Sequence, residues 1–190
     1  VLAPLDFPIA AIAQQHLRDK GVDLFLNTGV SAFEETAGGV KVMLNNGDEK
    51  LVDFVVLSIG VKPDTRLAQG AGLQIGDARG IVVNEYLQTS DPDIYAVGDA
   101  IEFINPITGR IMNTYLAGPA NKQGRICADN MVMGNIKKYN GAINTAILKI
   151  FDLTAGSTGM ASKNLLALEI EHKIATIRAG SHASYYPGAK

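Results

Sequence analysis

The sequence lacks most of the features that build disulfide frameworks, nucleic-acid surfaces and membrane spans. It holds one cysteine in 190 residues, so no internal disulfide can form, which is typical of a reducing compartment such as the cytoplasm. Lys and Arg number 17 against 19 Asp and Glu, which leaves no basic excess to neutralise nucleic-acid phosphates. The longest mainly apolar run, Phe54 to Ile59, has the length of a strand and is too short to cross a membrane. We therefore expect a folded cytoplasmic protein with no nucleic-acid partner and no membrane span.

Motifs for phosphate binding, redox exchange and metal binding are also missing. No Gly-x-Gly-x-x-Gly occurs, so the phosphate-binding start of a dinucleotide-binding unit is absent. Cys127 has no second cysteine for redox exchange, and we expect it to be a buried structural thiol on the apolar side of a helix. His16, His172 and His182 show no ligand spacing with one another or with Cys127, so we expect no metal site. His16 belongs to an amphipathic helix, and we expect a structural role for it.

Hydrophobic periodicity and turn residues predict a mixed chain of helices and strands. Asp6 is expected to cap the first helix, and Asp64 and Ser162 to cap two later ones. Strands 50–59 and 94–97 are apolar almost throughout, which is typical of strands that are covered on both faces. The expected helices are 8–20, 65–71, 119–133 and 162–168, and the expected strands are 22–26, 30–36, 40–44, 50–59, 80–83, 94–97, 102–104, 110–112, 144–151 and 169–179.

The strongest chemical signal is the segment from Thr89 to Asp99. A strand there delivers Gly98 and then Asp99 at its C-terminal end, where ligands bind in open α/β sheets. Glycine allows a close approach of backbone or ligand, and an ionised carboxylate accepts hydrogen bonds from hydroxyl groups. On residue types alone, Asp99 suits equally a hydroxyl-rich ligand or a cap on the following turn.

This segment resembles the second flavin-contacting motif of the FAD-dependent pyridine nucleotide–disulfide oxidoreductases. The resemblance implies that Asp99, following Gly98, hydrogen-bonds to a ribityl hydroxyl of FAD. The stretch from Leu116 to Arg125 resembles a helix start of the coenzyme A–disulfide reductase and NADH oxidase branch. There, Ala117, Gly118 and Pro119 would bring a helix N-terminus to the pyrimidine end of the flavin, where it stabilises the charge that reduction creates. We expect Pro119 at the first helical position.

The resemblance also implies roles for further residues in contacts with substrate, cofactor or the redox cysteine. The position of Asn121 contacts coenzyme A in related reductases. Gly60, at the end of a strand like the closing strand of the NAD(P)H domain, would pass near the nicotinamide. In Ser181 to Ala189, Tyr185 matches a tyrosine that reaches from one subunit toward the redox cysteine of the other, with Tyr186 as the second choice. From the residues alone, aromatic packing at a domain edge is the preferred interpretation of this tyrosine pair.

The resemblance covers the whole chain and implies its fold class. We expect an α/β chain with partial Rossmann-like FAD- and NAD(P)-binding layers and a β-meander, followed by the start of an α+β dimerisation domain. Residues 1–75 would be the later half of the NAD(P)H-binding domain, 76–138 the C-terminal segment of the FAD-binding domain, and 139–190 the truncated start of the dimerisation domain. The lack of an initial Met and of the family's redox cysteine leads us to expect a piece of a longer polypeptide.

The implied function is a flavoprotein oxidoreductase, of which this chain would be an inactive fragment. The full enzyme would pass electrons from NAD(P)H through FAD to a disulfide such as coenzyme A disulfide, or to oxygen. The expected cofactors are FAD and NAD(P)H, the expected partner is a small thiol or disulfide, and the expected assembly is a homodimer. Two alternatives stay open. One is a coenzyme A persulfide or polysulfide reductase, and the other is a non-catalytic module that dimerises through residues after 139.

Overall fold

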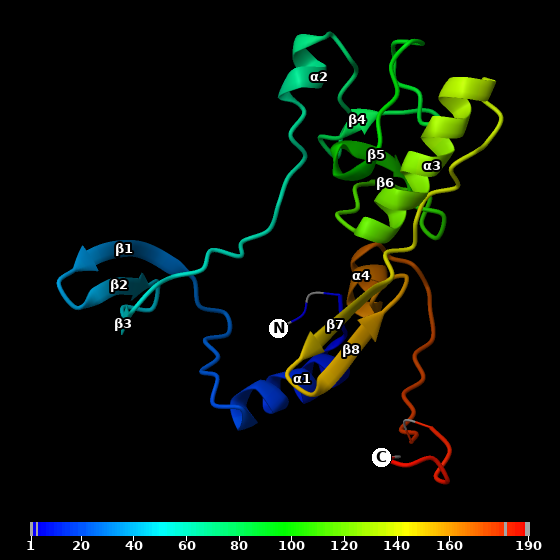
Figure 1. Ribbon diagram of the computed structural model, residues 1–190. Coiled ribbons are helices and arrows are strands. Elements are labelled where there is room, and N and C mark those ends of the chain that lie inside the picture. Colours follow the sequence, from blue (N-terminus) through cyan, green and yellow to red (C-terminus); the bar gives the residue numbers. More distant parts are fainter. Residues whose placement is uncertain (1, 3, 181, 189–190) are drawn as a thin grey trace.

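The computed structural model describes residues 2, 4–180 and 182–188 and divides them into three groups of elements (Figure 1). A β-meander stands apart from the rest of the chain, to which two extended connections join it. A second group surrounds the long helix α3, and a third combines the first helix with a late hairpin. The elements are α1 (Phe7–Asp19), β1 (Val30–Thr36), β2 (Gly39–Leu44), β3 (Glu49–Val52), α2 (Arg66–Gly70), β4 (Ile81–Val82), the 3-10 turn η1 (Gly98–Ala100), β5 (Ile101–Ile104), β6 (Ile111–Met112), α3 (Ala117–Met133), β7 (Ala146–Ile150), β8 (Leu153–Ser157) and α4 (Ser162–Ala167).

The meander is antiparallel throughout, in the order β1-β2-β3. Gly39 opens β2 with φ +127°, and a Cβ there would lie 2.4 Å from the carbonyl oxygen of Val52. Only glycine accepts both the backbone angle and this close approach. The predicted hairpin turns and the three predicted strands at this place are therefore confirmed, although the third strand is shorter than predicted.

The apolar run after β3 corrects the sequence-based expectation. Strand pairing stops at Val52, and residues 54–60 follow an extended, unpaired path toward α2 (Figure 1). Phe54 is 75% exposed and Ile59 is 89% exposed, so the predicted buried strand 50–59 is wrong beyond its first three residues. A strand needs a neighbour for its N–H and C=O groups, and no described segment pairs with this one. The predicted strands 22–26 and 169–179 are also absent from the described residues for want of a pairing neighbour.

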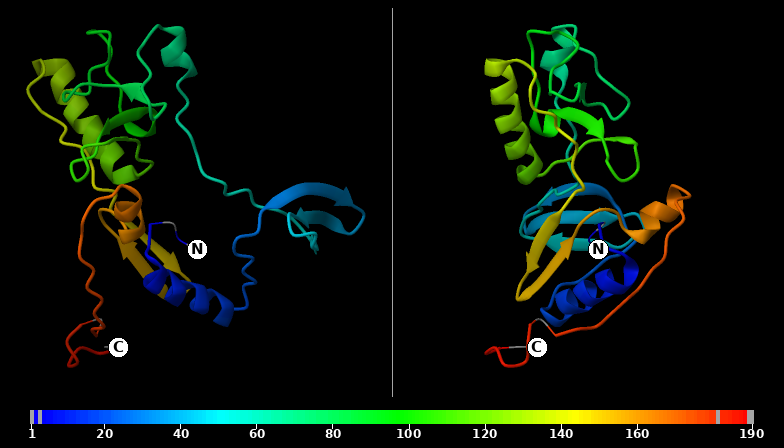
Figure 2. Two further views of the ribbon diagram at one scale, coloured as in Figure 1. Left: turned by 180° about the vertical axis from the view of Figure 1, so that it is seen from behind. Right: turned by 90° about the vertical axis from the view of Figure 1, so that its right-hand side faces the viewer.

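The main core lies between a small sheet and α3. β4 and β5 are parallel, and β5 and β6 are antiparallel, a mixed arrangement that also occurs in sheets of the predicted α/β class. The two further views in Figure 2 show α3 running along one side of this sheet. The buried residues of this core are Ala68, Ile81, Leu87, Ile101, Phe103, Cys127 and Tyr139.

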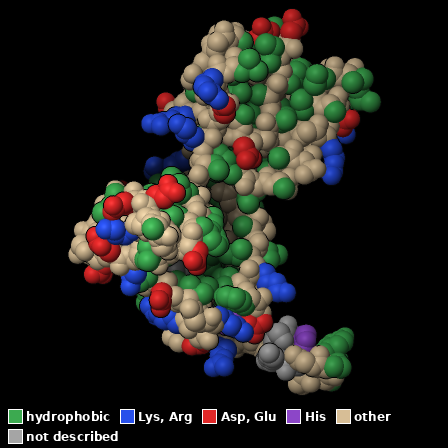
Figure 3. Space-filling model, turned by 60° about the vertical axis from the view of Figure 1, so that its left-hand side comes forward, with side chains coloured by type: hydrophobic (Ala, Val, Ile, Leu, Met, Phe, Trp, Pro, Cys, Tyr) green, Lys and Arg blue, Asp and Glu red, His purple; other side chains and the backbone are tan. Residues whose placement is uncertain are grey.

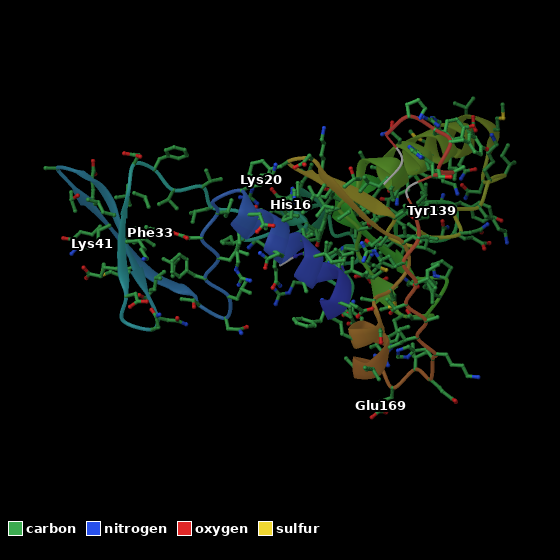
Figure 4. All side chains as sticks on the ribbon, turned by 90° about the horizontal axis from the view of Figure 1, so that it is seen from below. His16, Lys20, Phe33, Lys41, Tyr139 and Glu169 are labelled. Carbon is green, nitrogen blue, oxygen red and sulfur yellow. The ribbon has the colours of Figure 1, made fainter. Side chains whose placement is uncertain are left out.

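The first helix packs on the late hairpin β7–β8 rather than on the meander (Figures 1 and 2). His16 Nε2 lies 3.0 Å and Lys20 Nζ 2.8 Å from the carboxylate of Asp152, in the turn of that hairpin. Figure 4 shows His16 and Lys20 side by side on α1. The structural role expected for His16 is therefore confirmed.

The caps of the helices differ in part from the prediction. The N-cap residue of α2 is Thr65 and not Asp64 as predicted, although Asp64 accepts a 3.3 Å hydrogen bond from the N–H of Arg66 at the start of the helix. Asp6 precedes α1 but makes no side-chain cap there, because its carboxylate binds the first N–H groups of α4 instead. Ser162 is the first residue of α4 and not its cap. Among the described residues, no helix is long and apolar enough to cross a membrane.

Candidate functional site

The candidate site forms where η1 meets the first turns of α3. The chain enters through residues 94–97, which were predicted to be a buried strand. That prediction is wrong, because only Tyr95 makes a bridge, to Gln88, and Val97 is 36% exposed. Among the described residues, only the segment 87–91 forms backbone hydrogen bonds along 94–97, so the second edge of this stretch is unpaired. The segment nevertheless delivers Gly98 and Asp99 to the start of α3.

Gly98 makes the turn and fixes it to the helix. Its φ of +78° is a left-handed angle that favours glycine. Its N–H donates a 2.6 Å hydrogen bond to Oε1 of Gln123 on α3. A Cβ built on Gly98 would stand 4.0 Å from the Cβ of Ala120, so the turn lies close to the first turn of the helix.

Asp99 presents a free carboxylate beside this contact. Its side chain is exposed, and it makes no hydrogen bond or ion pair with any residue the structure describes. It therefore does not cap the following turn through its side chain. Its oxygens are available as acceptors, and a ligand with hydroxyl groups is the natural partner for them.

The start of α3 supplies hydrogen-bond donors next to that acceptor. Leu116 is the extended N-cap residue, and Ala117 and Gly118 are the exposed first two helical residues. Their N–H groups have no partner inside the helix, and the helix dipole makes this end partly positive. Pro119 is the third helical residue, so its predicted first position is wrong by two. A proline fits there because the first-turn N–H groups have no partner within the helix.

Asn121 completes the first turn. It is exposed, and its Nδ2 donates a 2.8 Å hydrogen bond to the carbonyl oxygen of Ala117. This contact ties the amide nitrogen to the first turn, and Oδ1 makes no hydrogen bond with the described residues.

Gln123 is the residue of this region that sequence reasoning missed. Its side chain is fully buried, and it joins α3 to the turn that carries Asp99. The spacing of residues along the helix could have identified it, because Gln123 lies on the same face of α3 as Cys127 and Asn130. These three are the buried residues of the helix. A polar residue on a buried helix face needs an explanation.

Other predicted site residues lie elsewhere. Gly60, with φ +96° and no atom near its missing Cβ, belongs to the extended connection between β3 and α2. Tyr185 and Tyr186 are 81% and 55% exposed, with ring centroids 4.8 Å apart. Their segment lies away from α3 in Figures 1 and 2. Ser181 and Ala189 of the same motif are outside the described residues. The structure thus brings together Gly98, Asp99 and 117–121, but not Gly60 or the tyrosines.

Cys127 is the buried thiol that was predicted. It is 7% exposed, and burial raises the pKa of its thiol. Its Sγ lies 3.7 Å from Sδ of Met131. Within the described ranges, no group of three or more His, Cys, Asp or Glu side chains is arranged to hold a metal ion.

A cavity of about 560 Å³ opens beside the residues that lead into α3. Its walls include Arg110, Tyr115, Leu116 and Asn144, but not Gly98 or Asp99. Oδ1 of Asn144 is buried and accepts no hydrogen bond from the described residues. The cavity therefore reaches Leu116, the N-cap residue of α3, but not the turn that carries Asp99.

Comparison with known families decides the identity of the chain. The family model described as pyridine nucleotide-disulphide oxidoreductase matches residues 1–121. The chain belongs to this family. The resemblance drawn from Thr89 to Asp99 and from Leu116 to Arg125 is thereby confirmed at the level of the family.

Individual relatives extend the likeness over the rest of the chain. A NADH oxidase of Methanocaldococcus jannaschii is 37% identical over 188 residues, which are 98% of this chain and 41% of that protein. An NAD-dependent persulfide reductase from A. fulgidus has a TM-score of 0.93 at 37% identity, over 99% of this chain and 35% of its own. The reduced Bacillus anthracis CoADR-RHD has a TM-score of 0.93 at 42% identity, over 100% of this chain and 34% of its own. The chain of this family member thus spans about two fifths or less of the length of these relatives.

Proposed function

We propose that this chain is part of a flavoprotein that passes electrons from NAD(P)H through FAD to a disulfide, a persulfide or oxygen. The observation that carries the proposal is the free Asp99 carboxylate, which Gly98 holds against the start of α3. Family membership and the likeness to a NADH oxidase and a persulfide reductase support it.

The donors and acceptors at this place fit FAD. A ribityl chain offers hydroxyl donors, which an ionised Asp99 accepts, and the pyrimidine end of a flavin offers carbonyl acceptors, which suit the free N–H groups of Ala117 and Gly118. Gly118 has no atom within 4 Å of a built Cβ, so a flat ring can approach the backbone closely.

When bound, FAD supplies the hydride and electron transfer that no side chain can perform. The chain's own residues would hold and polarise it. Asp99 would orient the ribityl tail, and the start of α3, with Pro119 in its first turn, would stabilise the negative charge that reduction creates. Gly60 would pass near the nicotinamide of NAD(P)H in the complete protein.

The substrate side rests on Asn121 and the tyrosine pair. We propose that Asn121 contacts a substrate of the coenzyme A type, and that Tyr185, or Tyr186 beside it, serves the redox cysteine of a second subunit in a homodimer. A phenol can donate a hydrogen bond to a thiolate. The exposure of both rings is compatible with a role at a subunit contact. In this arrangement 1–75, 76–138 and 139–190 are the NAD(P)H, FAD and dimerisation segments of a cytoplasmic enzyme.

The choice of electron acceptor separates two versions of the proposal. A coenzyme A persulfide or polysulfide reductase is favoured by similarity to the persulfide reductase and to a relative from Pyrococcus abyssi, described as "NAD(P)H sulfur oxidoreductase (CoA-dependent)", which is 34% identical over 151 residues. Similarity to CoADR-RHD and to the NADH oxidase favours the disulfide or oxygen version.

The test uses the full-length protein that contains this chain. The purified protein should carry a flavin absorbance spectrum that NADH or NADPH bleaches under anaerobic conditions. Turnover with coenzyme A disulfide, coenzyme A persulfide and oxygen, measured side by side, then identifies the acceptor. A colourless protein that takes up no FAD would contradict the proposal and favour the non-catalytic dimerisation module.

A further inference from the structure

We propose that Gln123 is a positioning residue for the flavin site, because it sets the distance between the turn that carries Asp99 and the start of α3. The inference rests on the proposed function and adds to it a residue that contacts neither flavin nor substrate.

The argument starts from the hydrogen bond between Gln123 and Gly98. Oε1 of Gln123 accepts the Gly98 N–H at 2.6 Å across 25 positions in the chain. The Gln123 side chain has no exposed surface at all. A hydrogen bond shielded from water in this way has no competing solvent partner, so it holds its geometry well. It is the polar link between η1 and α3 that the structure records.

The nitrogen of the Gln123 amide makes no hydrogen bond with the residues that the structure describes. Nε2 of Gln123 is buried without a hydrogen-bond acceptor, and so is the hydroxyl of Tyr139. Burial raises the pKa of Tyr139. An unpaired buried donor costs folding free energy, whereas an apolar side chain of similar length would fill the same space without that cost. The one side-chain hydrogen bond that Gln123 makes with the described residues is through its oxygen, to the N–H of Gly98.

The proposed flavin site has two parts, the turn η1 with Asp99 and the start of α3. Asp99 follows Gly98 directly, while Ala117 and Gly118 begin the helix on which Gln123 sits. A ligand that binds both halves needs them at a fixed separation, and binding weakens when supporting contacts let such groups drift. Removal of the Gln123 oxygen should release the turn and weaken flavin binding, although no group that touches the flavin has changed.

The experiment compares three variants of the full-length protein, each stripped of flavin and titrated with FAD. Gln123→Met removes the acceptor at similar volume and should raise the dissociation constant of FAD about tenfold. Gln123→Glu keeps an oxygen at the same place and should stay within about threefold of the natural protein. Cys127→Ala, one turn further along the same buried face, is the structural control. It should lower the melting temperature and leave the dissociation constant of FAD within about twofold.

A second readout separates positioning from general loosening. The visible spectrum of bound flavin reports its surroundings, so Gln123→Met should shift or blur the absorbance bands, whereas Gln123→Glu and Cys127→Ala should not. Equal FAD affinity and spectra in Gln123→Met and the natural protein would overturn the inference. So would a loss in Cys127→Ala as large as that in Gln123→Met. If Gln123→Met does not fold, a folded Gln123→Glu variant that loses tenfold in affinity overturns it, and one that binds FAD normally supports it. A natural protein that binds no FAD refutes the proposed function itself.

Discussion

Asp6 caps a helix that begins at Ser162, 156 positions later in the chain. Its carboxylate accepts the N–H of Ser162 at 2.8 Å and that of Lys163 at 3.1 Å. The Nζ of Lys163 in turn donates to the carbonyl oxygen of Leu5 at 2.8 Å. The start of the chain and α4 therefore hold each other, and α1 and α4 lie in one group of elements.

This cap predicts a pH-dependent contribution to stability. The backbone hydrogen bonds from Lys163 and Ser162 lower the pKa of Asp6 below its ordinary value. The folded state therefore gains from the ionised carboxylate above the ordinary Asp pKa of about 3.9, and this gain is lost as pH falls through the lowered pKa. Asp6→Ala should reduce the melting temperature at pH 7 and make less difference near pH 3. Asp23→Ala, at an exposed carboxylate without a recorded contact, is the control. An equal effect of the two changes at pH 7 would contradict the cap.

Gly80 predicts a packing effect in the sheet beside α3. A Cβ on this residue would stand 2.5 Å from the backbone nitrogen of Glu102 and 2.7 Å from the carbonyl carbon of Ile101. Since backbone cannot yield as a flexible side chain does, Gly80→Ala should cost about 1–3 kcal/mol of unfolding free energy. Gly70→Ala meets no atom within 4 Å at the end of α2 and should cost nothing. Chemical denaturation of both variants measures the difference, and equal midpoints would refute the predicted clash.

Cys127 should be chemically silent in the folded protein. Its burial restricts access, and the raised pKa of the thiol lowers the fraction of reactive thiolate. Treatment with iodoacetamide at pH 7.5, followed by peptide mass spectrometry, should find Cys127 modified after denaturation and not before. Rapid alkylation of native protein at Cys127 would show that the thiol is reactive after all.

Local signals allowed much of the fold to be predicted. Hairpin turns such as Gly38-Gly39 mark the meander, and Gly134 ends α3, with φ +76°. The wrong predictions concern segments whose structure depends on pairing with another strand. The apolar run 54–59 indicates burial, but pairing depends on a neighbouring strand that the described residues do not supply. β8 was missed because its Thr, Gly and Ser lack strand periodicity and follow from pairing with β7.

The site was predictable in its motifs and not in its internal contacts. Asp99 and the residues 117–121 stood out because their types and order carry a chemical meaning. The bond from Gly98 to Gln123 joins two segments through folding alone, and no local pattern reports it. The same is true of Asp6, whose partner depends on how α4 packs.

Many large apolar side chains of this chain are exposed. Figure 3 shows hydrophobic side chains reaching the surface in many places. Leu57 is 65% exposed and Ile147 is 76% exposed. Surfaces of this kind are typical of contacts with further protein segments.

The account depends most on Asp99 as the acceptor that holds FAD. The direct measurement is the FAD dissociation constant of the full-length protein, compared between Asp99→Ala and Asp93→Ala, which alters an exposed aspartate of the same motif. Removal of a charged acceptor should weaken FAD binding by at least about tenfold in Asp99→Ala and leave it unchanged in Asp93→Ala. Equal and tight FAD binding in both variants would contradict the account.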